Sequence, residues 1–106
     1  MYFKTEALDL GKVKQGDTVF AVFIVENRGK SALVIKSVSP SCGCTVAKYE
    51  EKPIPPTKSG IIKLIFATNG RIGKASKTAT VNSNAKPESK TLRFQCEIEV
   101  PNNKSK

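Results

Sequence analysis

Two cysteines separated by one glycine are the residues whose type and spacing best support chemistry in this sequence. Cys42, Gly43 and Cys44 follow Pro40 in a segment predicted to turn. A disulfide between such close residues closes a very small ring and is easily reduced, which suits redox exchange better than scaffolding. Two thiolates also suit Zn(II) or Cu(I), with Cys96 as a third ligand if the fold brings it near. In a third interpretation, both thiols only pack at the rim of the domain.

The absence of histidine limits the chemistry available elsewhere in the chain. Among 106 residues there is no His, which excludes Ser-His-Asp and Cys-His nucleophile systems, HExxH zinc sites and the usual general base near neutral pH. We therefore expect a non-enzymatic protein with no cofactor and no closed metal site within one chain. Three cysteines are an odd number, so at least one thiol stays free unless it pairs between chains.

Positive charge is concentrated in residues 52–93. This stretch holds nine Lys and Arg residues and one acidic residue, Glu88, and so carries +8 of the total +9. A field of this size can steer a domain toward nucleic acid, anionic lipid or an acidic partner. Nucleic-acid binding normally adds stacking aromatic residues, whereas Phe66 is the only aromatic residue here before Phe94. We favour lysines on the solvent-facing sides and edges of a sheet, and nucleic-acid binding is not expected.

Alternation of apolar and polar residues with a period of two dominates the chain, and no stretch shows a helical repeat. The longest apolar run, residues 19–25, has strand length and not membrane length. The pattern predicts an all-β fold, an immunoglobulin-like seven-stranded antiparallel β-sandwich over residues 1–100. Residues 11–17 are predicted to form a polar turn, and residues 101–106 a polar basic C-terminal tail. The expected strands span residues 3–8, 18–27, 33–38, 46–49, 61–67, 77–83 and 92–100.

The second expected strand is apolar on both faces. Phe20, Val22 and Ile24 alternate with an equally apolar set, so one set must face outward. Ile61 and Ile65 belong to the outer face of the fifth strand, which normally lies beside the second strand. Together these five residues form a candidate interface with a second copy or a neighbouring domain, unless a terminal segment, a loop or strand twist covers them. By the same alternation, Cys96 belongs to the core.

Several short motifs resemble those of a bacterial domain of unknown function. They occur in the family's order: Leu10-Gly11-Lys12-Val13, then Asn27-x-Gly29, then Ser41-Cys42-Gly43-Cys44-Thr45, then Gly73 through Asn84. That family is common in exported and surface proteins of the Bacteroidetes type. It is similar to the Hydin-like immunoglobulin superfamily, which includes major sperm protein and pilus chaperones. The sequence departs from the family's pattern at Pro56-Thr57, where Pro-Gly is usual, and at Cys96, where Gly is common.

The resemblance implies a non-enzymatic sandwich with no established activity. It also implies export to the periplasm or cell surface if a leader was trimmed, and an oxidising compartment favours the disulfide. Pilus-chaperone relatives bind by strand addition, for which the first, the short fourth and the last strands are candidate edges. Two hypotheses remain: a protein-interaction module with a protein partner, a neighbouring domain or a second copy, and a thiol redox or soft-metal site at Cys42 and Cys44.

Overall fold

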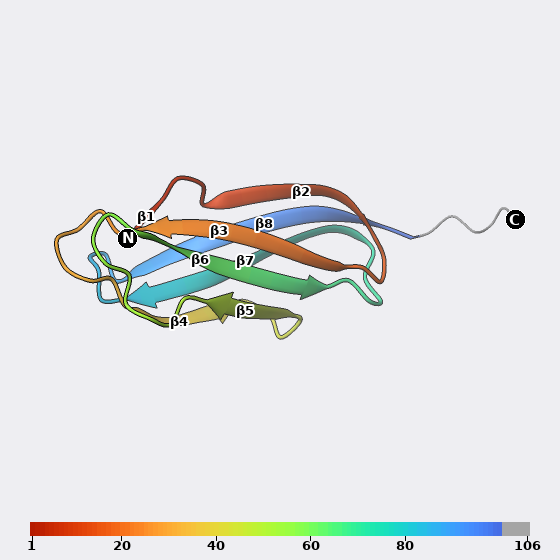
Figure 1. The fold of residues 1–106 in the computed structure, drawn as a ribbon. Coiled ribbons are helices and arrows are strands. Elements are labelled where there is room, and N and C mark those ends of the chain that lie inside the picture. The colour runs from red at the N-terminus through yellow and green to blue at the C-terminus, as the bar shows by residue number, and fades with distance from the viewer. Residues whose placement is uncertain (101–106) are drawn as a thin grey trace, which may run out of the picture.

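The structure is a computed structural model that describes residues 1–100. The predicted tail over residues 101–106 lies outside the described residues. The chain forms two stacked four-stranded sheets: sheet A, in the order β1-β3-β6-β5, and sheet B, in the order β2-β8-β7-β4 (Figure 1). This confirms the all-β, immunoglobulin-like sandwich. The strands are β1 (Tyr2–Phe3), β2 (Ala7–Lys14), β3 (Thr18–Glu26), β4 (Ile35–Pro40), β5 (Thr45–Tyr49), β6 (Ser59–Ala67), β7 (Gly73–Ser83) and β8 (Ser89–Glu99).

The N-terminal part of the sandwich differs from the prediction in strand number and direction. The single strand expected over residues 3–8 is two strands, β1 and β2, which lie in different sheets. The segment expected to be a turn from Gly11 onward is largely strand, and β2 pairs with β8 in parallel, not antiparallel. Gly11 has a φ of +74° at a shift in this register, and its N–H donates to Asp9 Oδ1 at 2.9 Å. The glycine and polar residues that predicted a turn here therefore belong to a β-bulge within a strand.

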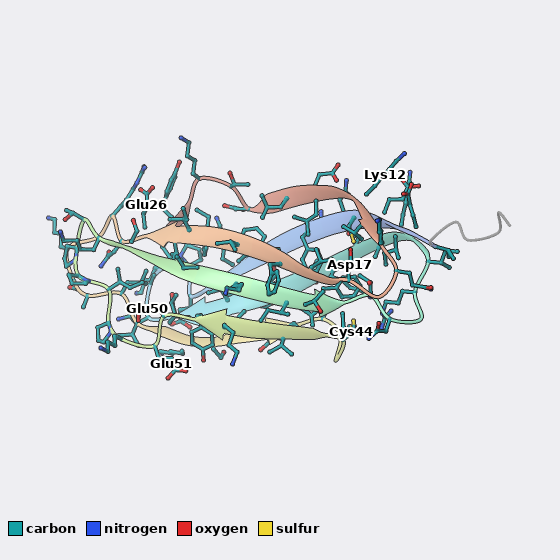
Figure 2. The ribbon with its side chains drawn as sticks, turned by 45° about the vertical axis from the view of Figure 1, so that its right-hand side comes forward. Lys12, Asp17, Glu26, Cys44, Glu50 and Glu51 are labelled. Atoms are coloured by element: carbon teal, nitrogen blue, oxygen red, sulfur yellow. A yellow bond between two sulfur atoms is a disulfide. The ribbon has the colours of Figure 1, made fainter. Side chains whose placement is uncertain are left out.

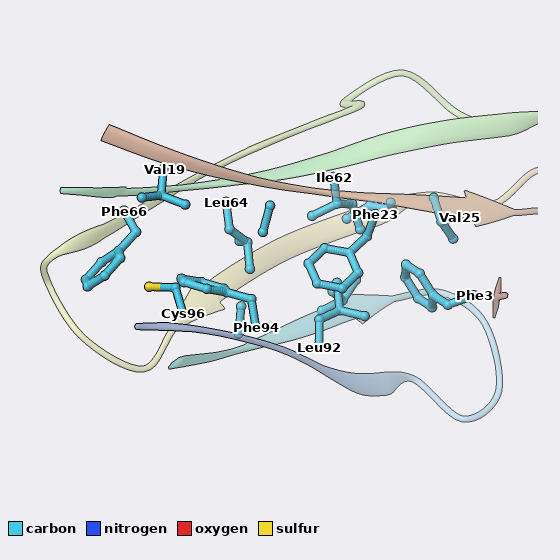
Figure 3. Close-up of a cluster of buried hydrophobic side chains, with 14 of the residues drawn as sticks. Phe3, Val19, Phe23, Val25, Ile62, Leu64, Phe66, Leu92, Phe94 and Cys96 are labelled. Carbon is cyan, nitrogen blue, oxygen red and sulfur yellow. The ribbon is translucent and has the colours of Figure 1, made fainter. Parts of the chain in front are cut away.

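The core lies between the sheets and follows the predicted faces. Ile62, Leu64 and Phe66 of β6 point inward, as do Leu92, Phe94, Cys96 and Ile98 of β8. Figure 3 shows the side chains it labels on β6 and β8 meeting Val19, Phe23 and Val25 of β3 between the two layers. The Phe66 and Phe94 rings lie 5.7 Å apart at 57°, a tilted contact that joins the sheets. Within residues 1–100, no helix has the length and hydropathy of a membrane span.

The sheet edges are short or irregular. In sheet A the edges are β1, of two residues, and β5, of five residues. In sheet B they are β2 and β4, each with a shift in its register, and β4 ends at Pro40. The last strand, β8, was a candidate edge in the sequence analysis, and this is wrong because β2 covers it. Short, bulged or Pro-terminated edges give an incoming strand little to pair with.

Asn27 is a buried polar residue that holds one end of the sandwich together. Its side chain is 4% exposed. Its Nδ2 donates to the carbonyl oxygens of Ser31 at 2.8 Å and Ile54 at 2.7 Å, and its Oδ1 accepts from the Gly29 N–H at 2.9 Å. Its backbone carbonyl also accepts from the Thr57 N–H. One amide thus joins the turn after β3 to the segment before β6, which gives the Asn-x-Gly motif a structural explanation.

Replacing Asn27 with Ala should lower the free energy of unfolding by about 2–4 kcal/mol, because the change leaves buried backbone groups without partners. Asn84 is the matched control: its amide accepts from the Val34 N–H and donates to Ala32 O, two bonds against the three of Asn27, but it is exposed. Asn84→Ala should cost less than about 1 kcal/mol. Urea denaturation measures both values. Equal losses for the two variants would contradict the special role of Asn27.

Candidate functional site

One outer sheet face is apolar and open to solvent. Five of its side chains are between 45% and 55% exposed: Phe20, Val22 and Ile24 on β3, Val46 on β5 and Ile61 on β6. Ile65 on β6 is half-buried. We call these six residues the apolar face. Four of the five predicted interface residues are thus exposed, and no segment within residues 1–100 buries them.

Strand register makes the apolar face continuous across three strands. Phe20 lies opposite Ile65, which in turn lies opposite Val46. Ile24 lies opposite Ile61 in a parallel row nearer the other end. Directly paired residues point to the same side of a sheet, so these rows form one surface. The sequence analysis missed Val46, although Lys48, two residues further on, marks the same side of this short strand as outward.

Two lysines form the middle row of the apolar face. Val22 lies opposite Lys63, and Lys63 lies opposite Lys48. The Lys63 Nζ is 5.6 Å from the centre of the Phe20 ring, within the range of a cation–π contact. Two rows of the apolar face therefore flank the lysines, and the second row, Ile24 and Ile61, continues on the chain after β5 with the exposed Glu50.

The outer face of sheet B has the opposite character. Its cross-strand pairs on β7 and β8 are polar: Ser76 with Gln95, Thr78 with Arg93, and Thr80 with Thr91. The two outer faces of one small domain therefore carry different side chains. A polar outer face is what an antiparallel sheet in contact with water normally shows, so the apolar face of sheet A is the exception.

The basic residues of the 52–93 stretch are spread over both sheets. Lys63 lies on β6 of sheet A, whereas Lys74 and Lys77 lie on β7 and Lys90 and Arg93 on β8 of sheet B. One of them, Lys90, forms an ion pair of 3.0 Å with Glu6. Lys74 and Arg93 face solvent, whereas Lys77 and Lys90 are half-buried opposite the core residues Phe94 and Val81, so these charges do not form one basic groove on a single face.

Cys42 and Cys44 form a disulfide in the connection that carries the chain from sheet B to sheet A. Their Cα atoms are 5.3 Å apart, and both side chains are half-buried. Cys44 packs against the core cluster, and its backbone N–H donates to the Cys42 sulfur at 3.2 Å. The turn lies at the same end of the molecule as Asp17, away from Glu26 and Glu50 (Figure 2).

Cys96 does not join the other two cysteines in a ligand set. Its side chain is 3% exposed in the core, and within residues 1–100 no three metal-ligating side chains gather. Burial raises the pKa of the Cys96 thiol, with a smaller contribution from the negative charge of Asp9. Cys96 is therefore a small apolar core residue, as expected from its position in β8.

Native protein prepared without reductant should show almost no reaction with iodoacetamide near neutral pH. Cys42 and Cys44 are joined, and the raised pKa of Cys96 keeps it in the thiol form until the pH rises above the range of an ordinary cysteine. In denaturant, one thiol should become modified. Mass spectrometry counts the modified sites, and rapid labelling of Cys96 in the folded protein would contradict its burial.

The fold is shared with several solved structures of low sequence identity. A protein of unknown function from Porphyromonas gingivalis W83 aligns with a TM-score of 0.76 at 18% identity, over 88% of this chain and 44% of that one. The VesB protease of Vibrio cholerae aligns with a TM-score of 0.71 at 15% identity, over 88% of this chain and 30% of that one. The ASH/PapD-like domain 7 of human CEP192 aligns with a TM-score of 0.62 at 13% identity, over 94% and 84%.

At these identities the similarity establishes the fold alone. The chain spans less than half the length of the first two solved chains. No curated protein matches the sequence significantly. The family described as a protein of unknown function, DUF1573, matches residues 1–98. This confirms the resemblance to a domain of unknown function, and because the match covers nearly the whole chain, the protein belongs to the DUF1573 family.

Proposed function

We propose that this domain is a non-enzymatic protein-interaction module that binds a surface of another protein through the apolar face of sheet A. The observation that carries the proposal is the contrast between the two outer faces. Sheet B shows the polar face expected next to water, whereas sheet A keeps large apolar side chains about half exposed at neighbouring positions. An apolar surface of this kind on a small domain typically marks a protein interface.

The lysine row specifies the chemistry of the partner. Burying Lys63 and Lys48 under a wholly apolar surface would leave two positive charges with one acidic neighbour, Glu50, which lines the same hollow, and the excess positive charge would cost several kcal/mol. A partner with Asp or Glu side chains surrounded by apolar ones would neutralise the two lysine charges and bury the two apolar rows. A second copy docked face to face about this row would place lysines against lysines. Charge therefore favours a different, acidic protein surface over self-association.

Docking on the face also fits the edges better than strand addition does. The edge strands of sheet A are short, and those of sheet B are interrupted by register shifts. The matching chains from Porphyromonas gingivalis and of the VesB protease are each more than twice as long as the region that matches, which supports a role beside other domains. We further propose an oxidising location outside the cytosol, supported by the Cys42–Cys44 disulfide.

Selection from a displayed library of random short peptides tests the proposed face. Peptides enriched on the folded domain should carry Asp or Glu flanked by apolar residues. Both Ile24→Glu and Lys63→Glu should weaken their binding by at least about tenfold, because the first variant charges an apolar row and the second reverses the central charge. Thr80→Glu on the outer face of sheet B is the matched control and should change binding by less than about twofold.

Fluorescence anisotropy with a labelled enriched peptide gives the dissociation constants. The proposal would be wrong if the enriched peptides lacked carboxylates, or if Thr80→Glu weakened binding as much as Ile24→Glu. Far-UV circular dichroism of each variant separates loss of binding from loss of fold.

A further inference from the structure

We propose that the Cys42–Cys44 disulfide is a thiol–disulfide exchange site that oxidises a dithiol of another protein. The inference is independent of the apolar face, because the turn lies at one end of the sandwich, between β4 and β5. It rests on three features: the bond is unnecessary for the shape of the turn, its two sulfurs are unequally placed, and its surroundings are positively charged.

Backbone hydrogen bonds already hold the turn in place. The Ser41 N–H donates to Thr78 O at 2.8 Å, the Thr45 N–H donates to Cys42 O at 3.2 Å, and the Ala67 N–H donates to Cys44 O at 3.4 Å. These bonds tie the turn to both sheets. A disulfide across one intervening residue constrains the unfolded chain far less than one across a long loop. The bond is therefore poorly suited to a scaffolding role.

The two sulfurs differ in their surroundings. Cys44 packs against the core cluster, whereas Cys42 is outside it. An incoming thiolate would therefore reach Cys42 Sγ and expel Cys44 as the leaving thiolate. The Thr45 hydroxyl lies 3.9 Å from Cys44 Sγ, and the Cys44 N–H donates to Cys42 Sγ at 3.2 Å, so each sulfur has a polar group beside it and the two differ in access. The sequence places this hydroxyl directly after the second cysteine.

Positive charge at this end of the sandwich favours the leaving thiolate. The Arg71 guanidinium and the Lys77 ammonium lie 5.6 and 5.8 Å from the centre of the Phe66 ring, and Phe66 is the cross-strand partner of Thr45. From residue 38 to residue 49 the only charged side chain is Lys48. Acidic side chains lie at this end too: Asp17 in the β2–β3 turn, and Glu97 and Glu99 at the end of β8, where they pair with Lys12 and Lys14 of β2. Nearby cations stabilise a thiolate over a thiol.

The exchange balances as a two-electron oxidation of the partner dithiol. One partner thiolate attacks Cys42 Sγ, the Cys42–Cys44 bond breaks, and a mixed disulfide with Cys42 forms while Cys44 leaves as a thiolate. The second partner thiolate then attacks the partner sulfur of the mixed disulfide and releases Cys42. The partner ends with a disulfide, and Cys42 and Cys44 take up the two protons that the partner thiols lost.

A reduced peptide with two cysteines is the probe for this activity. Wild-type protein should oxidise it stoichiometrically, and the double variant Cys42→Ser/Cys44→Ser should leave it reduced. With oxidised glutathione, Cys44→Ser should form a mixed disulfide at Cys42 at least about tenfold faster than Cys42→Ser does at Cys44, because only Cys42 is outside the core cluster. Cys96→Ser is the control and should react as the wild type does.

Mass spectrometry of acid-quenched samples reports each species. A wild-type disulfide that leaves the peptide reduced would overturn the proposal, as would equal rates at the two cysteines. Tight binding of Zn(II) or Cu(I) by the reduced pair, with loss of exchange, would also overturn it and identify a metal site.

Discussion

Nine residues of β3 pair with nine residues of β6 without a break in register. This pairing determines which side chains of the two strands point into the core and which point to solvent. Because side chains alternate along a strand, it sends Phe23 and Leu64 inward and Phe20 and Ile61 outward. A slip of one residue would exchange the two sets. The inner set, together with β8, holds the sheets together, so the outer set is available for another protein.

Polar residues close the two ends of this apolar stack. Asn27 joins the loops at one end, and the fully buried Thr68 joins them at the other, where its hydroxyl donates to Asp17 O at 2.7 Å and accepts from the Gly16 N–H at 2.8 Å. The Asn-x-Gly motif is therefore explained by folding, whereas the Cys-Gly-Cys turn is not, since backbone bonds already hold it. This difference makes the cysteines, not the asparagine, the candidate for chemistry.

The alternation of side chains predicted the sandwich and its inner and outer faces, because single polar residues showed which face of a strand points to solvent. Lys63 identified the outer side of β6, and the polar residues of β8 identified its inner side. The parallel pairing of β2 with β8 had no local signal, since it joins segments far apart in the sequence. Thr57 has a φ of +70° where the resembling family usually has glycine, so residue type did not indicate that turn. Five of the six residues of the apolar face were predicted, all but Val46, but the occupant of the face depends on a molecule outside this chain.

Carbene footprinting of the isolated domain over a series of protein concentrations tests the central claim most directly. This method labels side chains according to their exposure to solvent. The account predicts strong labelling of Phe20, Ile24 and Ile61, weak labelling of Phe23 and Phe66, and no change as the concentration rises. Loss of labelling on the apolar face at higher concentration would show that a second copy covers it, and weak labelling at every concentration would show that the face is not open. Either result would contradict a surface kept free for a different, acidic protein.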